Sequence, residues 1–386
     1  MPPCLTQATP YKGFFALILI FVALEYFFNT VSDTKNAIFN STRPLQYFDK
    51  ASTSTYGPLL KSLFKNASNL RSLQEIMKSG NISDLHYLVT MPPFIASTIL
   101  NNNKIMQEEN STKPLCPDIS QNLYGRVQIQ KYPVPSVGTL ENRFASWLQP
   151  GGHWKPPNCV VEKKVAIVIP FKCRGEHLLL FLQHMHPFLK RQQLDYTIFV
   201  VEQEGDGPFN RAMLMNVGYV EALKLRKFDC FIFHDVDLLP EDDRNLYTCP
   251  EQPRHMSVAV DIFKYRLPYP AIFGGVSAIS SEHFKLLNGF SNSFWGWGGE
   301  DDDMSNRIRY HHLYISRYPI TIARYTMLTH KKDSPNPNRY DLLRKGQKKF
   351  DQDGLVSLSY ELVMSNENLL YTWFLVKLHG PNEDTS

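Results

Sequence analysis

The chain has 386 residues, which is enough for one large domain plus additional segments. Hydrophobic residues make up 43% of the chain and charged residues 20%, and both fractions are ordinary for a globular protein. The formal net charge of +4 is too small to indicate a nucleic-acid-binding protein, and no basic helix or RNA-binding signature occurs in the sequence. The aromatic content of 13% suits an aromatic-lined ligand cleft without establishing one.

An apolar segment near the N-terminus favours a membrane anchor. Residues 13–24 carry no charge, and Glu25 follows near one end. As a helix, residues 13–28 would extend about 24 Å at roughly 1.5 Å per residue, close to the thinner bilayers of the early secretory route. A cleaved signal peptide is the alternative, but no clear small-residue cleavage site follows. We therefore expect a cytosolic tail over residues 1–12 and an uncleaved anchor, although Lys12 alone is weak evidence for orientation.

Residues 29–115 differ from the rest of the chain because they are rich in Asn, Ser, Thr and Lys and show poor periodicity. All four glycosylation sequons fall within this segment, and they start at Asn40, Asn66, Asn81 and Asn110. An Asn-rich composition yields some sequons by chance, yet their confinement here predicts a glycosylated lumenal stem. We expect the catalytic domain to occupy residues 116–386.

The cysteines also favour an oxidising compartment. Cys4 precedes the apolar segment, and five cysteines follow it. Cys230 and Cys249 flank one acidic segment, while Cys116 and Cys159 are candidates for a second bridge. The alternative is a set of unpaired buried cysteines. No CxxC spacing indicates a zinc site.

The region after residue 160 alternates between strand and helix patterns. Apolar runs predict strands over residues 165–171, 196–201 and 230–234. Helical patterns occupy the two intervening stretches, residues 176–194 with an interruption near Pro187, and residues 211–227. This β-α-β-α-β order predicts an α/β domain with a mainly parallel sheet covered on both faces. Ligands in such sheets bind at the carboxyl ends of the strands.

Two aspartates directly follow the third predicted strand. Asp235 and Asp237 are positioned to direct carboxylates into a cleft, and carboxylates suit Mg²⁺ or Mn²⁺. An Asp-x-Asp is common, so its place at a strand end carries the inference. No Walker or Gly-x-Gly-x-x-Gly loop is present to bind phosphates. A metal would therefore have to neutralise them, assisted by the nearby basic residues Lys172, Arg174 and Arg211.

Residues 294–303 combine two tryptophans, three glycines and four consecutive acids. Acids suit the first turn of a helix, so a solvated helix N-terminus starting at these carboxylates is one interpretation. The tryptophans favour a binding loop instead, because indoles supply flat stacking surface and glycines permit close approach to a ligand.

Five motifs occur in an order that resembles the animal β1,4-galactosyltransferase family, which includes invertebrate β1,4-N-acetylgalactosaminyltransferases. The motifs occupy residues 209–211, 235–237, 273–278, 295–303 and 336–339. The resemblance covers roughly residues 116–365. It implies a single-pass type II Golgi membrane protein with a lumenal GT-A-like catalytic domain, whose mainly parallel mixed sheet is flanked by helices. It also implies a UDP-sugar donor and Mn²⁺.

The same resemblance implies roles for individual residues. The manganese ligands would be Asp237, Met327 and His330. The donor site would contain Pro170, Phe171, Arg174, Phe209, Arg211, Asp235, Val236, Ile272 and Trp297. The acceptor site would contain Gly299, Glu300, Asp301, Arg339, Tyr340 and Leu343. Asp301 would be the general base, with Glu300 beside it in the catalytic set.

The chain departs from the family pattern at several positions. Lys172 and Cys173 stand where the family usually has Arg-Asn, which makes Cys173 the expected unpaired thiol. Tyr340 replaces a more frequent Phe. Ile272 stands where galactosyl-transferring members have Tyr, whose ring and hydroxyl disfavour an acetamido group on the donor. Isoleucine resembles the N-acetylgalactosaminyl branch, although neutral drift of a buried residue is the alternative.

The resemblance therefore predicts transfer of N-acetylgalactosamine from UDP-GalNAc to the 4-hydroxyl of a terminal N-acetylglucosamine on a glycoprotein or glycolipid, with β1,4 linkage. The alternative donor is UDP-galactose. Two other classes remain open. A glycoside hydrolase also uses paired carboxylates but would work without a metal. A non-catalytic lectin would keep Trp297 and Arg339 without releasing UDP.

Overall fold

The computed structural model describes residues 113–331 and 335–379. The expected cytosolic tail, anchor and four sequons, and nearly all of the expected stem, lie outside the described residues. Within the described ranges, no helix combines the length and apolar character needed to span a bilayer.

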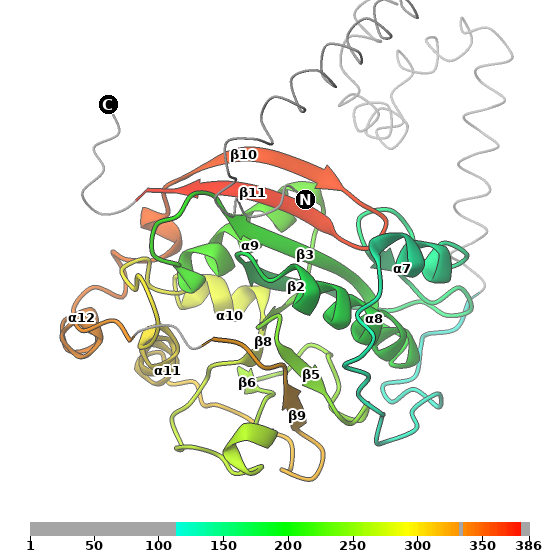
Figure 1. Ribbon diagram of the computed structural model, residues 1–386. Helices are drawn as coiled ribbons and strands as arrows, with labels where there is room; N and C mark the ends of the chain where they lie inside the picture. The colour runs from blue at the N-terminus through cyan, green and yellow to red at the C-terminus, as the bar shows by residue number, and fades with distance from the viewer. Residues whose placement is uncertain (1–112, 332–334, 380–386) are drawn as a thin grey trace, which may run out of the picture. The chain divides into compact units, whose positions relative to one another are not determined.

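One mixed eight-stranded sheet organises the domain (Figure 1). Its order is β10-β11-β3-β2-β4-β8-β6, with β1 pairing beside β3. The four central strands are mutually parallel, and they are β11 (Thr372–Leu378), β3 (Asp195–Gln203), β2 (Lys164–Phe171) and β4 (Cys230–His234). The antiparallel strands are β10 (Tyr360–Glu367), β8 (Val276–Ser280), β6 (Arg254–His255) and β1 (His153–Trp154). The predicted α/β class with a mixed, centrally parallel sheet is confirmed.

The alternation of side chains along the central strands divides the core into two layers. In β2, Ile167 and Ile169 belong to one apolar cluster, whereas Val168 belongs to the other. Successive strand residues point to opposite faces, so both faces need cover. Helix α8 (Gly175–Arg191) packs in the first cluster and α9 (Arg211–Leu225) in the second. The predicted helix on each face is therefore present.

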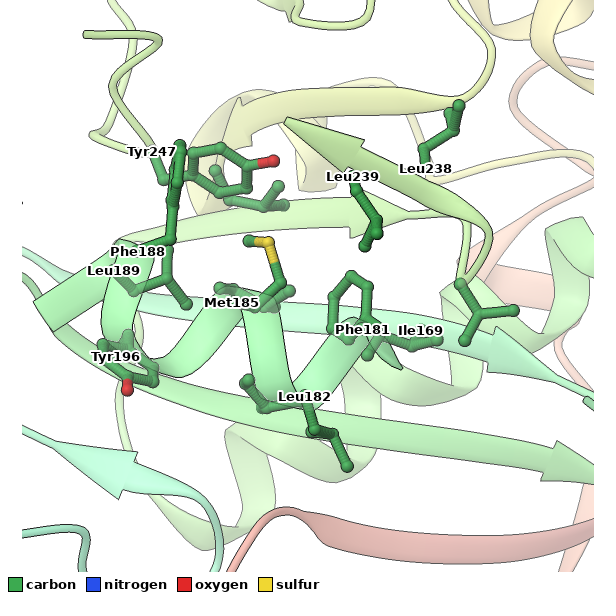
Figure 2. Packing of buried hydrophobic residues seen from close by; sticks show 14 of the residues in the cluster. Ile169, Phe181, Leu182, Met185, Phe188, Leu189, Tyr196, Leu238, Leu239 and Tyr247 are labelled. Carbon is green, nitrogen blue, oxygen red and sulfur yellow. The ribbon is translucent and has the colours of Figure 1, made fainter. Parts of the chain in front are cut away.

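Figure 2 shows the first cluster, in which α8 lies between the large sheet and a small one. Phe181 and Met185 of α8 belong to the same cluster as Leu239 of β5 and Tyr247, and Figure 2 shows Ile169 of β2 beside Phe181. The small sheet has the order β5-β9-β7. Its strands are β5 (Leu238–Pro240), β9 (Arg324–Met327) and β7 (Ala259–Val260). Contact on both sides buries most of α8, including the polar side chains of Gln183 and His186.

The predicted interruption of this helix near Pro187 is wrong. Helix α8 continues through Pro187 to Arg191. A proline inside a helix removes one hydrogen bond and costs about 3 kcal/mol. Phe188 and Leu189 follow the proline and are completely buried, so their burial offsets that cost. The sequence pattern alone did not reveal how much apolar contact this last turn makes.

The remaining described helices frame the carboxyl end of the sheet or its flanks. They are α7 (Val137–Phe144), η2 (Asp261–Phe263), α10 (Ser281–Leu286), α11 (Glu300–Tyr310), α12 (Arg339–Gly346) and η3 (Leu355–Ser357). Figure 1 shows α11 and α12 side by side at one end of the domain, and the two helices are in contact. Helix α11 begins at the four consecutive acids, as one sequence interpretation expected.

Two disulfides join the cysteine pairs that the sequence favoured. Cys116 is bonded to Cys159, and Cys230 is bonded to Cys249. The expectation that Cys173 is an unpaired thiol is wrong, because Cys173 is also disulfide-bonded.

A buried ion pair fixes α11. Arg307 Nε lies 2.7 Å from Asp303 Oδ2, and both side chains are essentially inaccessible. Arg307 also donates to three backbone carbonyls, those of Leu287, Phe350 and Asp353. Burial raises the pKa of Asp303, and the Arg307 charge opposes that rise. The arginine thus allows a carboxylate in the interior and ties α11 to two distant segments.

We expect Arg307→Leu to destabilise the fold by about 3–5 kcal/mol, because it leaves Asp303 buried without its counter-charge. The urea midpoint of unfolding measures this effect. The double variant Asp303→Asn, Arg307→Leu should recover part of the loss, since it no longer buries an isolated charge. If the double variant were less stable than Arg307→Leu by as much as an independent second substitution would cost, loss of the ion pair would not explain the destabilisation.

Candidate functional site

Strands β2 and β4 end at the same edge of the sheet. They are parallel neighbours, with Val168 opposite Phe233. Pro170 and Phe171 close β2 and are buried, while Asp235, Val236 and Asp237 follow β4. The backbone N–H of Asp235 donates to the Gly275 carbonyl, which holds the turn after β4 against the start of β8. The topology therefore brings the Asp-x-Asp to the expected edge.

Arg211 links the turn after β4 to the helix that carries the acids. It is the first residue of α9, whose N-cap Asn210 accepts a hydrogen bond from the Met213 N–H. Arg211 Nε lies 2.6 Å from Asp235 Oδ1, and Arg211 Nη1 lies 3.5 Å from Glu300 Oε1. Burial lowers the pKa of Arg211, but the surrounding carboxylates raise it by more. The guanidinium is a permanent charge between two acidic groups.

Asp237 and His330 meet at the other side of this turn. His330 Nε2 lies 2.8 Å from Asp237 Oδ2. His330 Nδ1 lies 2.8 Å from the Lys331 carbonyl, to which it must donate because a carbonyl only accepts. In the neutral ring this leaves a lone pair on Nε2 facing a carboxylate oxygen. Two acceptors at that distance require a proton or a cation between them.

Met327 is brought to the same place by strand pairing. It lies opposite Leu238 in the antiparallel pair β5–β9, and the Leu328 N–H donates to the Asp237 carbonyl. Asp261 Oδ1 accepts from the Met327 N–H at 3.0 Å. The strand register thus places Met327 beside Asp237, while the chain after β9 returns His330 to it.

These three side chains fit a divalent cation. Burial, followed by the neighbouring Asp235, raises the pKa of Asp237 to about 6. A cation would relieve both effects, and the backbone-bonded imidazole presents the correct nitrogen to a metal. Among the described residues, no group of three or more His, Cys, Asp or Glu side chains forms a metal site. A thioether as the third ligand is consistent with that finding, although it is an unusual partner for a hard ion.

The first turn of α11 holds two carboxylates beside this edge. Burial raises the pKa of Asp301 to about 7, with further contributions from Glu300 and Asp302 and an opposing one from Arg211. Burial also raises the pKa of Glu300, whose Oε2 is buried without a hydrogen-bond partner among the described groups. A carboxyl group with a pKa near neutrality is suited to accept a proton.

Gly274 provides the space that Asp301 occupies. A Cβ built on Gly274 would lie 2.7 Å from Asp301 Oδ2 and 3.2 Å from its Cγ. The backbone of Gly274 is not in the left-handed region, so the absence of a side chain, rather than backbone conformation, is what matters here. The glycine of one motif therefore positions the acid of another.

The loop before α11 presents an exposed tryptophan. Trp297 is 59% exposed, whereas Trp295 packs against the second apolar cluster. Gly296, Gly298 and Gly299 adopt positive φ angles of 81°, 99° and 99°, which only glycine tolerates readily. The loop is held by backbone bonds, because the Gly296 N–H donates to Phe209 and the Asn336 N–H donates to Trp297.

Helix α12 carries the residues expected at the acceptor side. The Arg339 side chain packs on Gly298 and Gly299, where an added Cβ would lie 3.2 Å from Arg339 Cδ and 3.3 Å from Arg339 Cβ. The Arg339 guanidinium lies 4.4 Å from the centre of the Tyr340 ring, which is 68% exposed. Leu343 lies one turn further along α12 and is half-buried.

The other expected donor residues surround the same edge. Arg174 precedes α8, Phe209 precedes α9, and Ile272 precedes β8; all three are half-buried. Arg317 holds the segment that contains Ile272 by donating to its carbonyl at 2.8 Å. The roles that the resemblance implies for these residues remain proposals.

The sequence interpretation missed several residues that support the site. Tyr269 donates to Asp302 Oδ1 at 2.9 Å, and Asp261 holds the β9 backbone at Met327. His177 lies with its ring centre 6.4 Å from that of His330. Only Gly274 had a sequence signal, as part of the motif at residues 273–278. The other contacts join segments far apart in sequence, so no local pattern indicates them.

Comparison with known proteins agrees with this geometry. Residues 116–250 match the N-terminal region of glycosyl transferase group 7, and residues 254–331 match the N-terminal domain of galactosyltransferase. Beta-1,4-galactosyltransferase 3 of Homo sapiens is 47% identical over 263 residues, which cover 67% of each chain. The Cricetulus griseus form is equally identical, over 66% of its length, so the match spans about two thirds of these relatives.

Solved structures show the same fold class. The catalytic domain of Drosophila beta-1,4-galactosyltransferase 7, in complex with xylobiose, has a TM-score of 0.51 and 34% identity, covering 56% of this chain and 94% of that one. A mutant of that enzyme in complex with manganese, UDP-Gal and xylobiose has a TM-score of 0.50 and 32% identity, with the same coverage. The domain has a GT-A-like glycosyltransferase fold. The chain belongs to the animal β1,4-galactosyltransferase family.

Proposed function

We propose that this protein is a manganese-dependent, inverting β1,4-glycosyltransferase that moves a sugar from a UDP-sugar to the 4-hydroxyl of a terminal N-acetylglucosamine. Two features of one sheet edge carry this proposal. The Asp237–His330 contact is suited to a cation, and Asp301, whose pKa is raised, is suited to accept a proton. Arg211 lies beside Glu300, the neighbour of Asp301. The Drosophila enzyme that was solved with manganese and UDP-Gal supports the proposal, as do the relatives at 47% identity.

In this proposal, Asp237, Met327 and His330 hold manganese, which would supply Lewis-acid stabilisation to the leaving diphosphate. Arg211 and Arg174 add positive charge on the donor side. Asp301 accepts the proton of the acceptor hydroxyl as that oxygen attacks the anomeric carbon. Glu300 fixes the N-terminus of α11 against Arg211. Trp297 stacks on the donor, while Arg339, Tyr340 and Leu343 surround the acceptor's acetamido group.

Galactose is the donor sugar that the comparisons support better, since the relatives are beta-1,4-galactosyltransferases. One residue favours N-acetylgalactosamine as a second candidate. Ile272 stands directly before Phe273 and Gly274, where the family's galactosyl-transferring members have a tyrosine. Its smaller, hydroxyl-free side chain leaves apolar room for an N-acetyl methyl group. The two donors differ only at C2, so this position is suited to discriminate between them.

We expect Ile272→Tyr to shift the donor preference toward UDP-galactose, whatever the preference of the wild type. A panel of UDP-Gal, UDP-GalNAc and UDP-GlcNAc, with Mn²⁺ and a terminal N-acetylglucosamine acceptor, gives the ratio of kcat/KM values. Introducing one unfavourable contact of this kind with the acetamido group is worth about 1–3 kcal/mol, or about 10–200-fold. Ile262→Tyr, at an exposed position on η2, is the matched control. An unchanged donor ratio in Ile272→Tyr would remove the pocket argument.

Gly274→Ala should lower kcat by about 10–100-fold, because the added methyl group displaces the Asp301 carboxylate. UDP binding should change little, since the donor residues are not displaced. Gly138→Ala is the control, because a Cβ there meets nothing within 4 Å and the residue lies inside α7. Steady-state kinetics on both variants measures the effect. Equal kcat values for the two alanine variants would show that Gly274 does not position the base.

The proposal also includes the arrangement of the whole chain. Residues 1–12 would be cytosolic, residues 13–28 the Golgi signal-anchor and residues 29–115 the glycosylated stem. The acceptor would be a glycoprotein or a glycolipid. Hydrolysis of a glycoside that persists in EDTA would favour a metal-independent hydrolase instead, and sugar binding without UDP release would favour a lectin.

A further inference from the structure

A second cavity lies on the side of α8 that faces away from the large sheet. It has a volume of about 390 Å³, within the size range of small-molecule sites. Its floor is formed by Gln183, His184, Pro187 and Arg191 of α8. The other lining residues are Arg143 of α7 and, from the segment before it, Tyr124, Arg126, Val127, Gln128 and Gln130. The α8 residues of the cavity lie 9 to 17 residues beyond Arg174, so the cavity begins about 14 Å from that donor residue and ends about 25 Å from it along the helix.

The lining is strongly cationic. It contains three arginines and no aspartate or glutamate. Arg191 Nε is 2.9 Å from Asp243 Oδ2, and Asp243 is fully buried behind it. Arg126 and Arg143 are exposed and form no ion pair among the described residues, so the cavity keeps two uncompensated charges. Arginine is charged at any physiological pH and presents a planar set of donors that matches oxyanions.

The neutral polar groups of the cavity also present donors. Gln183 is only 8% exposed, and its Oε1 accepts a long 3.5 Å bond from Arg143 Nη1. No acceptor for the Gln183 amide N–H₂ occurs within the described part of the chain, and this group lines the cavity. Gln128 and Gln130 add two exposed amides from the facing segment. The Gln183 amide nitrogen is not among the fully buried atoms without a partner, so it is open to the cavity, where a ligand oxygen could replace water as its acceptor.

We propose that this cavity binds an anionic glycan, a sugar chain that bears sulfate or carboxylate groups, at a site separate from the catalytic edge. The arginines would contact the oxyanions, and the three glutamines would bind hydroxyls and ring oxygens. The cavity is larger than one sulfate requires, which favours an oxyanion carried on a sugar. Such a site would retain acidic glycans, or acceptors that carry them, on the enzyme.

The test is a binding titration of the full-length chain at fixed ionic strength. The probes are a heparin-derived hexasaccharide, a hyaluronan hexasaccharide, neutral chitohexaose and a hexaglutamate peptide. We expect at least one anionic sugar to bind tenfold or more tightly than chitohexaose. Binding of the sulfated probe alone identifies sulfate as the recognised group, whereas equal binding of hyaluronan shows that a carboxylate suffices.

The double variant Arg126→Glu, Arg143→Glu should weaken anionic sugar binding tenfold or more. Lys163→Glu, Lys227→Glu changes the net charge equally at exposed positions elsewhere and should alter it less than twofold. Glycosyl transfer to a small neutral acceptor should be unchanged in both, which shows that the variants fold. Equal losses in the two double variants, or hexaglutamate binding as tightly as the sugars, would overturn the proposal. None of these binding outcomes depends on the proposed transfer reaction.

Discussion

Asp301→Asn should reduce kcat by about 10²–10⁴-fold, the usual contribution of a general base. An amide is almost isosteric with the carboxyl group and cannot accept the proton of the attacking hydroxyl. UDP and manganese binding should be nearly unchanged, because Asp237, His330 and Arg211 do not bond to Asp301. The matched variant is Asp302→Asn, one residue further along α11. Its amide oxygen can still accept the bond from the Tyr269 hydroxyl, and the base is kept, so its kcat at pH 8 should stay within about tenfold of wild type.

The pH dependence gives an independent check. Burial, then Glu300 and Asp302, raise the pKa of Asp301 to about 7, and the base is active when deprotonated. The kcat/KM value should therefore rise with pH through about 7 and then level off. Asp302→Asn removes one repulsive charge, so its profile should shift to lower pH.

A raised folded-state pKa also means that ionised Asp301 costs stability above pH 7. Asp301→Asn should then melt no lower than wild type at pH 8, and full turnover in this variant would exclude Asp301 as the base.

The central strands could be predicted from sequence because each is a short apolar run that must cover two faces. Residues 230–234 were predicted with the observed bounds, and Asp235 and Asp237 followed at the expected sheet edge. The first turn of α11 was also recognisable from its four acids. These features depend on the order of apolar and acidic residues within a short segment, which can be read from a single sequence.

Other features depend on contacts between distant segments. Helix α8 continues through Pro187 because the helical turn after the proline is buried. The sequence of the helix does not indicate that burial. Cys173 is disulfide-bonded, although the odd number of cysteines after the N-terminal apolar segment suggested otherwise. The space that Gly274 leaves for Asp301 joins residues 27 positions apart in the chain. No periodicity indicates such a contact.

The metal contact was the least predictable part from residues alone. A methionine in an apolar strand is ordinarily a core residue, and His330 is one of twelve histidines. Only the family resemblance singled out these two side chains together with Asp237. The structure adds a physical reason, because β9 pairs with β5 and the Lys331 carbonyl orients the His330 ring.

Asp237→Ala should weaken manganese binding strongly and abolish transfer. The variant removes the carboxylate that faces His330 Nε2 at 2.8 Å and leaves a single imidazole with a thioether, a weak set for a hard ion. Manganese affinity should fall by about 10–100-fold or more, the range seen even for the groups that support metal ligands. Electron paramagnetic resonance of unbound Mn²⁺ measures affinity without requiring turnover. Asp351→Ala, at an exposed site, should bind the ion as the wild type does.

Metal removal tests the same contact in the unmodified protein. EDTA should stop transfer, and Mn²⁺ should restore it more fully than Ca²⁺, because Ca²⁺ prefers six to eight oxygen ligands. His330→Gln should retain part of the manganese affinity of the wild type. The glutamine amide oxygen can still reach the ion, but Asp237 is then the only strong ligand that remains. The order of affinity would then be wild type, His330→Gln, Asp237→Ala. Unaltered manganese binding in Asp237→Ala would place the ion elsewhere, and the Asp237–His330 contact would become a structural ion pair that holds the chain after β9 to the turn after β4.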